Sequence, residues 1–204
     1  MRCSDEDAVR DLDTFLQQRE AVLLEDEAEK IVNACHAMAV RFHRGGKLVV
    51  FGNGGTSTDA QHVAVEFVHP VIVGKRALPA ISLTNDIATL TGVAAGVGMD
   101  EVFAHQIHHL ADPVDIALGI SSDGECENVL RGLQVSRQLG LLTIALTGGS
   151  GGKIASAELD HVLNVRSSDP RVVKEMHVTT YHVLWELVHV FFEQPSCLES
   201  EVVK

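Results

Sequence analysis

The residues best suited to chemistry lie in one short stretch, residues 49–66. An apolar run there leads into the turn Gly52-Asn53-Gly54-Gly55, which small hydroxyl residues follow. Free backbone N–H groups at a helix N-terminus suit an anion or a polyol, so this turn is a candidate ligand cradle. One helical turn further on, His62 and Glu66 are four residues apart and share a face. A titratable pair therefore accompanies the cradle; the alternative is a solvated surface pair on an ordinary helix.

The elements that position these residues follow from hydrophobic patterning. Short, nearly continuous apolar runs predict strands covered on both faces, at residues 47–52, 79–83, 114–120, 142–147 and 161–165. Helical patterns alternate with them, near residues 58–68, 101–110, 125–138, 152–157 and 170–192. This alternation predicts an α/β fold with a doubly wound parallel sheet and right-handed crossovers.

Polar loops are expected to meet at one edge of this sheet. In a doubly wound sheet, ligands bind at the carboxyl ends of the strands. The loops there span residues 52–57, 84–86, 121–126 and 147–152, and all are rich in Gly, Ser, Thr or Asn. Their convergence indicates a site for a polar ligand more strongly than any one loop does.

The predicted domain organisation is one globular unit, residues 45–193, between two terminal segments. Apolar positions at helical spacing over residues 5–44 predict one long helix or two consecutive helices, ended by Gly45-Gly46. This N-terminal helical segment, residues 1–44, packs either on its own domain or on a partner chain. Residues 194–204 are predicted to form a loose acidic tail.

Composition excludes several classes of function. The 204 residues carry a formal net charge of −12, whereas a general nucleic-acid binder needs a basic face. The four cysteines show no C-x-x-C spacing, so neither a disulfide framework nor a structural zinc site is expected. The acidic start does not resemble a secretory signal, and no apolar run reaches the length of a membrane span. A cytoplasmic protein that contacts neither nucleic acid nor membrane is expected.

Several segments together carry a resemblance to a known family. They are Gly52-Asn53-Gly54-Gly55, Asp59-Ala60-Gln61-His62 with Glu66, Pro79-Ala80-Ile81-Ser82-Leu83-Thr84 with Asp86, Asp100-Glu101-Val102-Phe103 with Gln106, Leu146-Thr147-Gly148 with Gly151-Gly152, and Glu175-Met176-His177 with His182. This pattern resembles the sugar-isomerase (SIS) family and, within it, the phosphoheptose isomerases. The resemblance implies a five-stranded parallel sheet and a homotetramer with active sites at subunit contacts. It also implies interconversion of sedoheptulose 7-phosphate and D-glycero-D-manno-heptose 7-phosphate through a cis-enediol.

The resemblance further implies roles for individual residues. Glu66 would be the carboxylate that moves a proton between two carbons, and His182 its acid/base partner. Zinc, which some members hold, would lie among His62, Glu66 and His182. The candidate contacts to a sugar phosphate or sugar derivative are Asn53, Gly54, Gly55, Thr56, Glu66, Ser121, Ser122, Asp123 and Lys174. The chemistry agrees, because aldose–ketose isomerisation needs a base for a carbon-bound proton and a donor to oxygen, and a metal can take the polarising role.

The chain departs from the family pattern in three places. Where the family's phosphate loop ends in Ser-Gly-Asn-Ser, this chain has Ser121-Ser122-Asp123-Gly124-Glu125-Cys126. An Asp carboxylate about 5 Å from a phosphate charge costs about 3 kcal/mol at an effective dielectric of roughly 20, so a phosphate site requires Asp123 and Glu125 to turn outward. Ala95-Gly96 replaces an Asn-Asp substrate pair, and Lys174 replaces a metal- and substrate-binding Gln. A charged Lys174 beside Glu66 could do a metal's electrostatic work or inactivate the site.

Two other functions stay open on these departures. One is a non-catalytic SIS module that binds a sugar derivative or a protein. The other is an isomerase with an altered substrate, such as an unphosphorylated sugar whose hydroxyl groups would donate to Asp123 and Glu125. The remaining histidines, His105, His108, His109, His177 and His189, are interpreted as ordinary core or surface residues.

Overall fold

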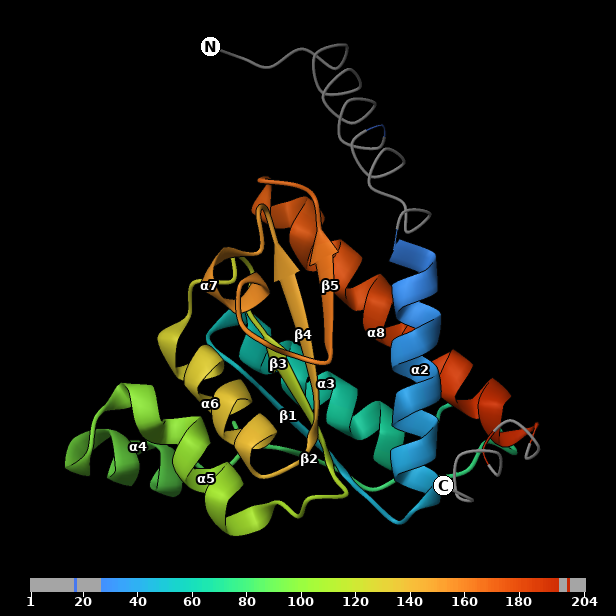
Figure 1. The fold of residues 1–204 in the computed structure, drawn as a ribbon, viewed down its shortest axis with the longest axis horizontal. Coiled ribbons are helices and arrows are strands. Elements are labelled where there is room, and N and C mark those ends of the chain that lie inside the picture. The colour runs from blue at the N-terminus through green and yellow to red at the C-terminus, as the bar shows by residue number, and fades with distance from the viewer. Residues whose placement is uncertain (1–16, 18–26, 195–197, 199–204) are drawn as a thin grey trace, which may run out of the picture.

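A five-stranded, all-parallel sheet forms the centre of the computed structural model, which describes residues 17, 27–194 and 198 (Figure 1). The strands are β1 (Leu48–Gly52), β2 (Ala80–Ser82), β3 (Ile116–Ile120), β4 (Leu142–Gly148) and β5 (His161–Val165). Their spatial order is β2-β1-β3-β4-β5, so the strand order reverses beside β1. The predicted doubly wound fold is confirmed, and its switch point, where ligands bind in such sheets, lies between β1 and β3.

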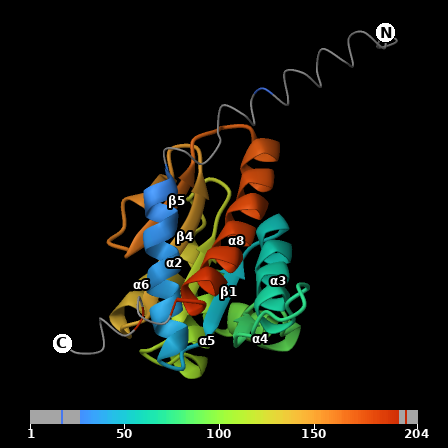
Figure 2. The ribbon, with the colours of Figure 1, turned by 90° about the vertical axis from the view of Figure 1, so that its right-hand side faces the viewer.

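Helices cover both faces of the sheet (Figures 1 and 2). They are α2 (Ala28–His43), α3 (Gly55–Val68), α4 (Ile87–Gly96), the 3₁₀ turn η2 (Met99–Glu101), α5 (Val102–Leu110), α6 (Glu127–Gln138), α7 (Gly152–Ala155) and α8 (Pro170–Phe192). One face packs against α2, α3 and α8, and the other against α5, α6 and α7. None of the helices in the described ranges is long and apolar enough to cross a membrane.

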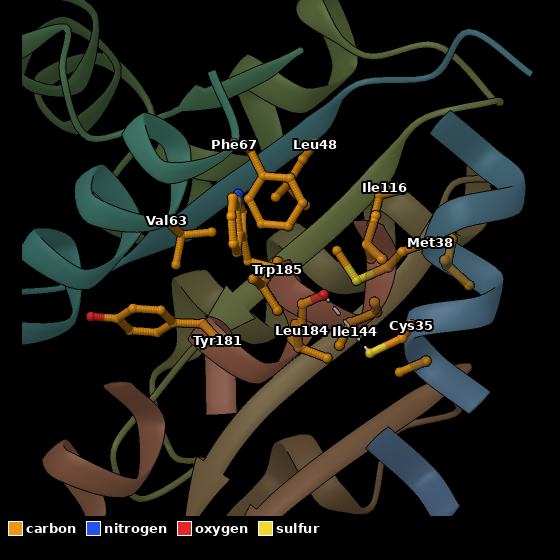
Figure 3. Packing of buried hydrophobic residues seen from close by; sticks show 14 of the residues in the cluster. Cys35, Met38, Leu48, Val63, Phe67, Ile116, Ile144, Tyr181, Leu184 and Trp185 are labelled. Carbon is orange, nitrogen blue, oxygen red and sulfur yellow. Dashed lines mark hydrogen bonds between the residues drawn. The ribbon is translucent and has the colours of Figure 1, made fainter. Parts of the chain in front are cut away.

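Alternate residues of each strand supply the two cores. On β1, Leu48 and Val50 belong to the core under α2, α3 and α8, whereas Val49 and Phe51 belong to the opposite one. This alternation follows from the two-residue period of a strand, and it explains why the strands read as unbroken apolar runs. Figure 3 shows the first core, in which Trp185 lies beside Phe67 and Val63. The two helices that carry the predicted site, α3 and α8, are fixed by this core.

The helix α2 packs on the sheet of its own chain. Its residues Cys35 and Met38 are fully buried in the core with α8, and the Cys35 thiol donates to the backbone oxygen of Leu184 at 3.9 Å. The N-terminal helical segment was expected to pack either on its own domain or on a partner chain, and its α2 part packs on its own domain. Most of the prediction for residues 5–26 lies outside the described residues, as does most of the predicted tail, residues 194–204. Leu198, which is described, is buried.

The structure also contains α4 and η2, which the sequence patterns do not predict. Asp86 begins α4, because its carboxylate accepts hydrogen bonds from the backbone N and the hydroxyl of Thr89, at 3.1 and 2.5 Å. The helix has no buried residue although it is mostly apolar. The sequence of α4 therefore lacks the alternation of an apolar face and a polar face by which an amphipathic helix is recognised.

Candidate active site

The glycine turn between β1 and α3 forms a tight, hydrogen-bonded cradle. Gly54 has a φ of 54°, which favours glycine. A Cβ on Gly52 would lie 2.6 Å from the Thr56 hydroxyl oxygen, so glycine is also required there. Asn53 donates its backbone N–H to that hydroxyl at 2.8 Å, and its side-chain amide exchanges hydrogen bonds with the amide of Asn128 on α6, at 2.7 and 3.1 Å. The cradle is thereby tied to the helix that follows β3.

The predicted titratable residues meet between α3 and α8. His62 Nε2 lies 3.2 Å from Glu66 Oε1, and the rings of His62 and His182 have centroids 5.3 Å apart. One potential ligand atom from each of His62, Glu66 and His182 lies within 4.8 Å of the others. The indole N–H of Trp185 donates to the backbone oxygen of Glu66 at 2.9 Å, which holds the two helices together at this point. The structure thus assembles residues that are more than 110 positions apart in the chain.

This trio has the donor set of a zinc site. Two imidazole nitrogens and one carboxylate oxygen are the protein ligands of many catalytic zinc ions, which keep a further position for water or substrate. Among the described residues, these three are the group of His, Cys, Asp and Glu that could hold a metal ion. Glu66 is partly buried and both histidines are exposed, so the group is open to solvent.

A small cavity of about 200 Å³ lies beside the cradle. It is lined by Asn53, Gly55, Thr56, Ser122, Pro170, Lys174 and His177. Most of these are predicted substrate contacts, and they come from the loops after β1 and β3 together with the start of α8. The cavity therefore lies at the switch point of the sheet, where a ligand is expected.

Lys174 is bound to Asp59 and not to Glu66. Its ammonium donates to Asp59 Oδ1 at 2.6 Å and to the backbone oxygen of Gly55 at 2.9 Å. The Asp59 side chain is 4% exposed and that of Lys174 is 41% exposed, so one end of this pair is buried and the other reaches the cavity. The ion pair that the structure gives to Lys174 is thus with Asp59, and not the pairing with Glu66 that the sequence suggested as a possibility.

The acidic residues of the loop after β3 make their contacts outside the lining of the cavity. Asp123 Oδ1 accepts hydrogen bonds from the Ser121 hydroxyl at 3.2 Å and from the backbone N of Glu125 at 3.0 Å. A Cβ on Gly152 would lie 2.6 Å from Glu125 Oε1, which places that carboxylate against the turn before α7. Neither Asp123 nor Glu125 lines the cavity, whereas Ser122 does. Ser121 and Asp123 are thus hydrogen-bonded within their own loop, and neither of its two carboxylates lines the cavity.

Four residues of this region had no functional role predicted from the sequence: Asp59, Asn128, His177 and Tyr181. His177 is 1% exposed, and its Nε2 lies 3.0 Å from the backbone oxygen of Thr147. Burial lowers the pKa of His177, which keeps the ring neutral and lets Nε2 donate to that oxygen. Burial likewise raises the pKa of Tyr181 to about 12, and the charges of Asp59 and Glu66 act in the same direction. The signal that could have found Asp59 and Tyr181 is their helical spacing from His62 and Lys174.

Ala95 and Gly96, the departure that the resemblance pointed to, lie at the exposed end of α4 and do not line the cavity.

The sequence model of the SIS domain matches residues 14–148. The chain belongs to the SIS-domain family. Among its curated SIS-domain relatives, the phosphoheptose isomerase of Aquifex aeolicus is 41% identical over 161 residues, which cover 79% of this chain and 84% of that protein. The phosphoheptose isomerase of Thermodesulfovibrio yellowstonii is 38% identical over 192 residues, 94% of this chain and 91% of that protein.

Solved SIS-domain structures share the fold over nearly their whole length. A phosphoheptose isomerase from Francisella tularensis, 30% identical, superimposes with a TM-score of 0.82 and covers 89% of this chain and 98% of that one. The phosphoheptose isomerase from Neisseria gonorrhoeae, 29% identical, gives a TM-score of 0.80 and covers 90% and 97%. The chain therefore contains the complete SIS fold found in these enzymes.

Proposed function

We propose that the protein is a sugar-phosphate aldose–ketose isomerase of the phosphoheptose type, which converts sedoheptulose 7-phosphate into D-glycero-D-manno-heptose 7-phosphate. The observation that carries this proposal is the group of His62, Glu66 and His182, whose potential ligand atoms lie within 4.8 Å of one another at the end of the cradle helix. The curated relatives named phosphoheptose isomerase support it.

In this mechanism Glu66 is the base. Its carboxylate removes the proton from the carbon beside the carbonyl and returns it to the neighbouring carbon, and the intermediate is a cis-enediol. His182, across from it on α8, moves the proton between the two sugar oxygens. His62, 3.2 Å from Glu66, orients the carboxylate. The trio also fits zinc, and a bound zinc ion would supply polarisation of the carbonyl oxygen.

The cavity is assigned to the phosphate end of the substrate. The backbone N–H of Gly55 and the hydroxyl of Ser122 offer donors at the cavity, and Lys174 brings a positive charge. The absence of Asp123 and Glu125 from the lining of the cavity supports an anion at this position.

We further propose a cytoplasmic homotetramer with active sites at subunit contacts. An exposed apolar surface supports self-association; it comprises Val65, Val68, Val71, Ile72 and Val73, of which Val73 is 101% exposed. Val65 neighbours Glu66, so a subunit covering this surface would also shield the trio from water. The free thiols of Cys35 and Cys126 suit a reducing compartment.

The activity is tested with purified protein and sedoheptulose 7-phosphate, with and without added zinc. Glu66→Gln should lower kcat by about 10² to 10⁴-fold, the usual contribution of a positioned base. Glu186→Gln, an exposed carboxylate on α8 that pairs with Lys75 at 3.5 Å, is the matched control and should leave kcat unchanged. Absence of turnover, or turnover that survives Glu66→Gln, contradicts the proposal; binding of the sugar phosphate without turnover would favour a non-catalytic module.

The assembly is tested by analytical ultracentrifugation. Val73→Asp should lower the sedimenting mass, because it places a charge in the proposed contact. Val32→Asp changes a valine of 44% exposure on α2 and should not do so. Equal masses for both variants would count against this surface as the contact.

A further inference from the structure

The two carboxylate oxygens of Asp59 have different surroundings. Oδ1 accepts the hydrogen bond from Lys174, whereas Oδ2 is buried and accepts none from the described residues. Because the side chain is 4% exposed, solvent does not readily supply the missing partner. A buried carboxylate oxygen in this state favours the approach of a donor.

Tyr181 brings a hydroxyl group to this region from α8. The tyrosine is 2% exposed, and its phenol is near enough to Asp59 and Glu66 for both charges to act on it. Figure 3 shows the hydroxyl pointing away from Leu184 and Ile144, out of the apolar core. The phenol stays protonated at neutral pH, so it serves as a donor to a carboxylate.

The ring of Tyr181 contacts both imidazoles of the trio. Its centroid lies 4.9 Å from that of His182, at an interplanar angle of 62°, and 5.5 Å from that of His62, at 53°. With the distance of 5.3 Å between the two imidazoles, the three rings form a triangle. Both histidines are exposed, so Tyr181 is the buried member against which they pack.

We propose that Tyr181 is a positioning residue of the candidate active site: its ring fixes the orientation of His62 and His182, and its hydroxyl is the group drawn toward the buried Asp59 oxygen that lacks a donor among the described residues. The proposal rests on the isomerase function proposed above. The Asp59 carboxylate then positions the ammonium of Lys174 directly and the two imidazoles of the trio through Tyr181. Residues that orient such groups matter because proton transfer and metal binding both require defined ring orientations.

The competing explanation is that Tyr181 only fills the core, to which it also belongs. Tyr181→Phe separates the two, because it keeps the ring and removes the hydroxyl. Phe191→Leu is the control: Phe191 lies on the same helix and makes an edge contact with His36, at 5.2 Å and 64°, away from the site. Far-UV circular dichroism establishes that each variant is folded.

The first readout is independent of activity. In proton NMR spectra, Tyr181→Phe should move the imidazole C–H resonances of His62 and His182 and leave that of His36 in place, whereas Phe191→Leu should do the reverse. Unmoved His62 and His182 resonances in Tyr181→Phe overturn the proposal whether or not the protein is an isomerase.

The second readout is kinetic, with sedoheptulose 7-phosphate as substrate. Tyr181→Phe should lower kcat by about tenfold with little change in KM, in line with the effect of removing an orienting partner. Asp59→Asn should lower kcat similarly and also raise KM, because Lys174 loses its anchor. The double variant should have the kcat of Asp59→Asn alone, since both changes break one contact. Additive losses in kcat would show that the hydroxyl and the carboxylate act separately and would overturn the link between them.

Discussion

Replacing Lys174 with Met should destabilise the protein, because it leaves a buried carboxylate without a partner. Asp59 Oδ2 already lacks a hydrogen bond among the described residues, and Lys174 is the cation bound to Oδ1 at 2.6 Å. At an effective dielectric of roughly 20, this separation corresponds to about 6 kcal/mol of attraction. The lysine side chain is 41% exposed, so screening by solvent reduces that figure substantially. We expect the free energy of unfolding to fall by about 3 kcal/mol, at the lower end of the cost of breaking a buried pair.

Urea unfolding followed by circular dichroism measures this loss, at one protein concentration because self-association would contribute to stability. Lys153→Met is the matched control: its ammonium pairs with Glu127 at 3.2 Å, with both side chains more than half exposed. It should cost at most about 1 kcal/mol. Adding Asp59→Asn to Lys174→Met should restore most of the stability, since no buried charge is then left alone. A loss in Lys174→Met as small as that in Lys153→Met, or a double variant no more stable than the single one, would refute the reasoning.

Two further predictions concern the supports of the site. Burial lowers the pKa of His177 below its ordinary value of 6.5. Below about pH 6.5 the unfolded chain therefore binds more protons than the folded protein does. The free energy of unfolding should have its full value above that pH and should fall as the pH drops from there to the lowered pKa. His177→Gln should flatten this dependence in urea titrations between pH 7.5 and 5, and an unchanged slope would assign it to other groups. Gly124→Ala should destabilise the fold by more than the roughly 1–2 kcal/mol of a left-handed alanine, because φ is 75° and the new Cβ would lie 1.9 Å from the backbone oxygen of Gly151. Gly149→Ala is the control, because Gly149 has a φ of 63° but open space around the new Cβ, so this variant has only the conformational cost. If thermal unfolding showed equal losses of stability for the two variants, the predicted clash at Gly124 would be contradicted.

The strands were predictable because their information is local. Unbroken runs such as that of β1 are bounded by Gly46 and by the glycines after Phe51, and the structure starts and ends β1 within the predicted range. The edge strand β2 is shorter than predicted; it pairs with β1 alone, over Ala80, Ile81 and Ser82. The helix α4 escaped prediction because its apolar residues surround the whole helix and leave no periodic stripe.

The contacts that shape the site were not predictable in the same way. Asp59 and Lys174 are 115 residues apart in sequence, and Asn53 and Asn128 are 75 apart, so nothing in a local window links either pair. A loop sequence likewise does not show which contacts a carboxylate makes. From the sequence, Asp123 was expected to repel an anion, whereas the structure shows that it accepts a hydrogen bond from its own loop. Helical spacing pointed to His62 and Glu66, the resemblance added His182, and the structure supplied the proximity of His182 to His62.

The hydrogen bond behind Glu66 gives the protein a built-in optical reporter. Trp185 is the single tryptophan of the chain, 5% exposed, and its indole N–H donates to the backbone oxygen of Glu66. Its ring also lies 4.5 Å from that of His189. The tryptophan fluorescence of the unlabelled protein therefore comes from one residue at the junction of α3 and α8. Any event that moves Glu66 relative to α8, whether zinc uptake, sugar binding or subunit assembly, should change that emission without a substrate having to react.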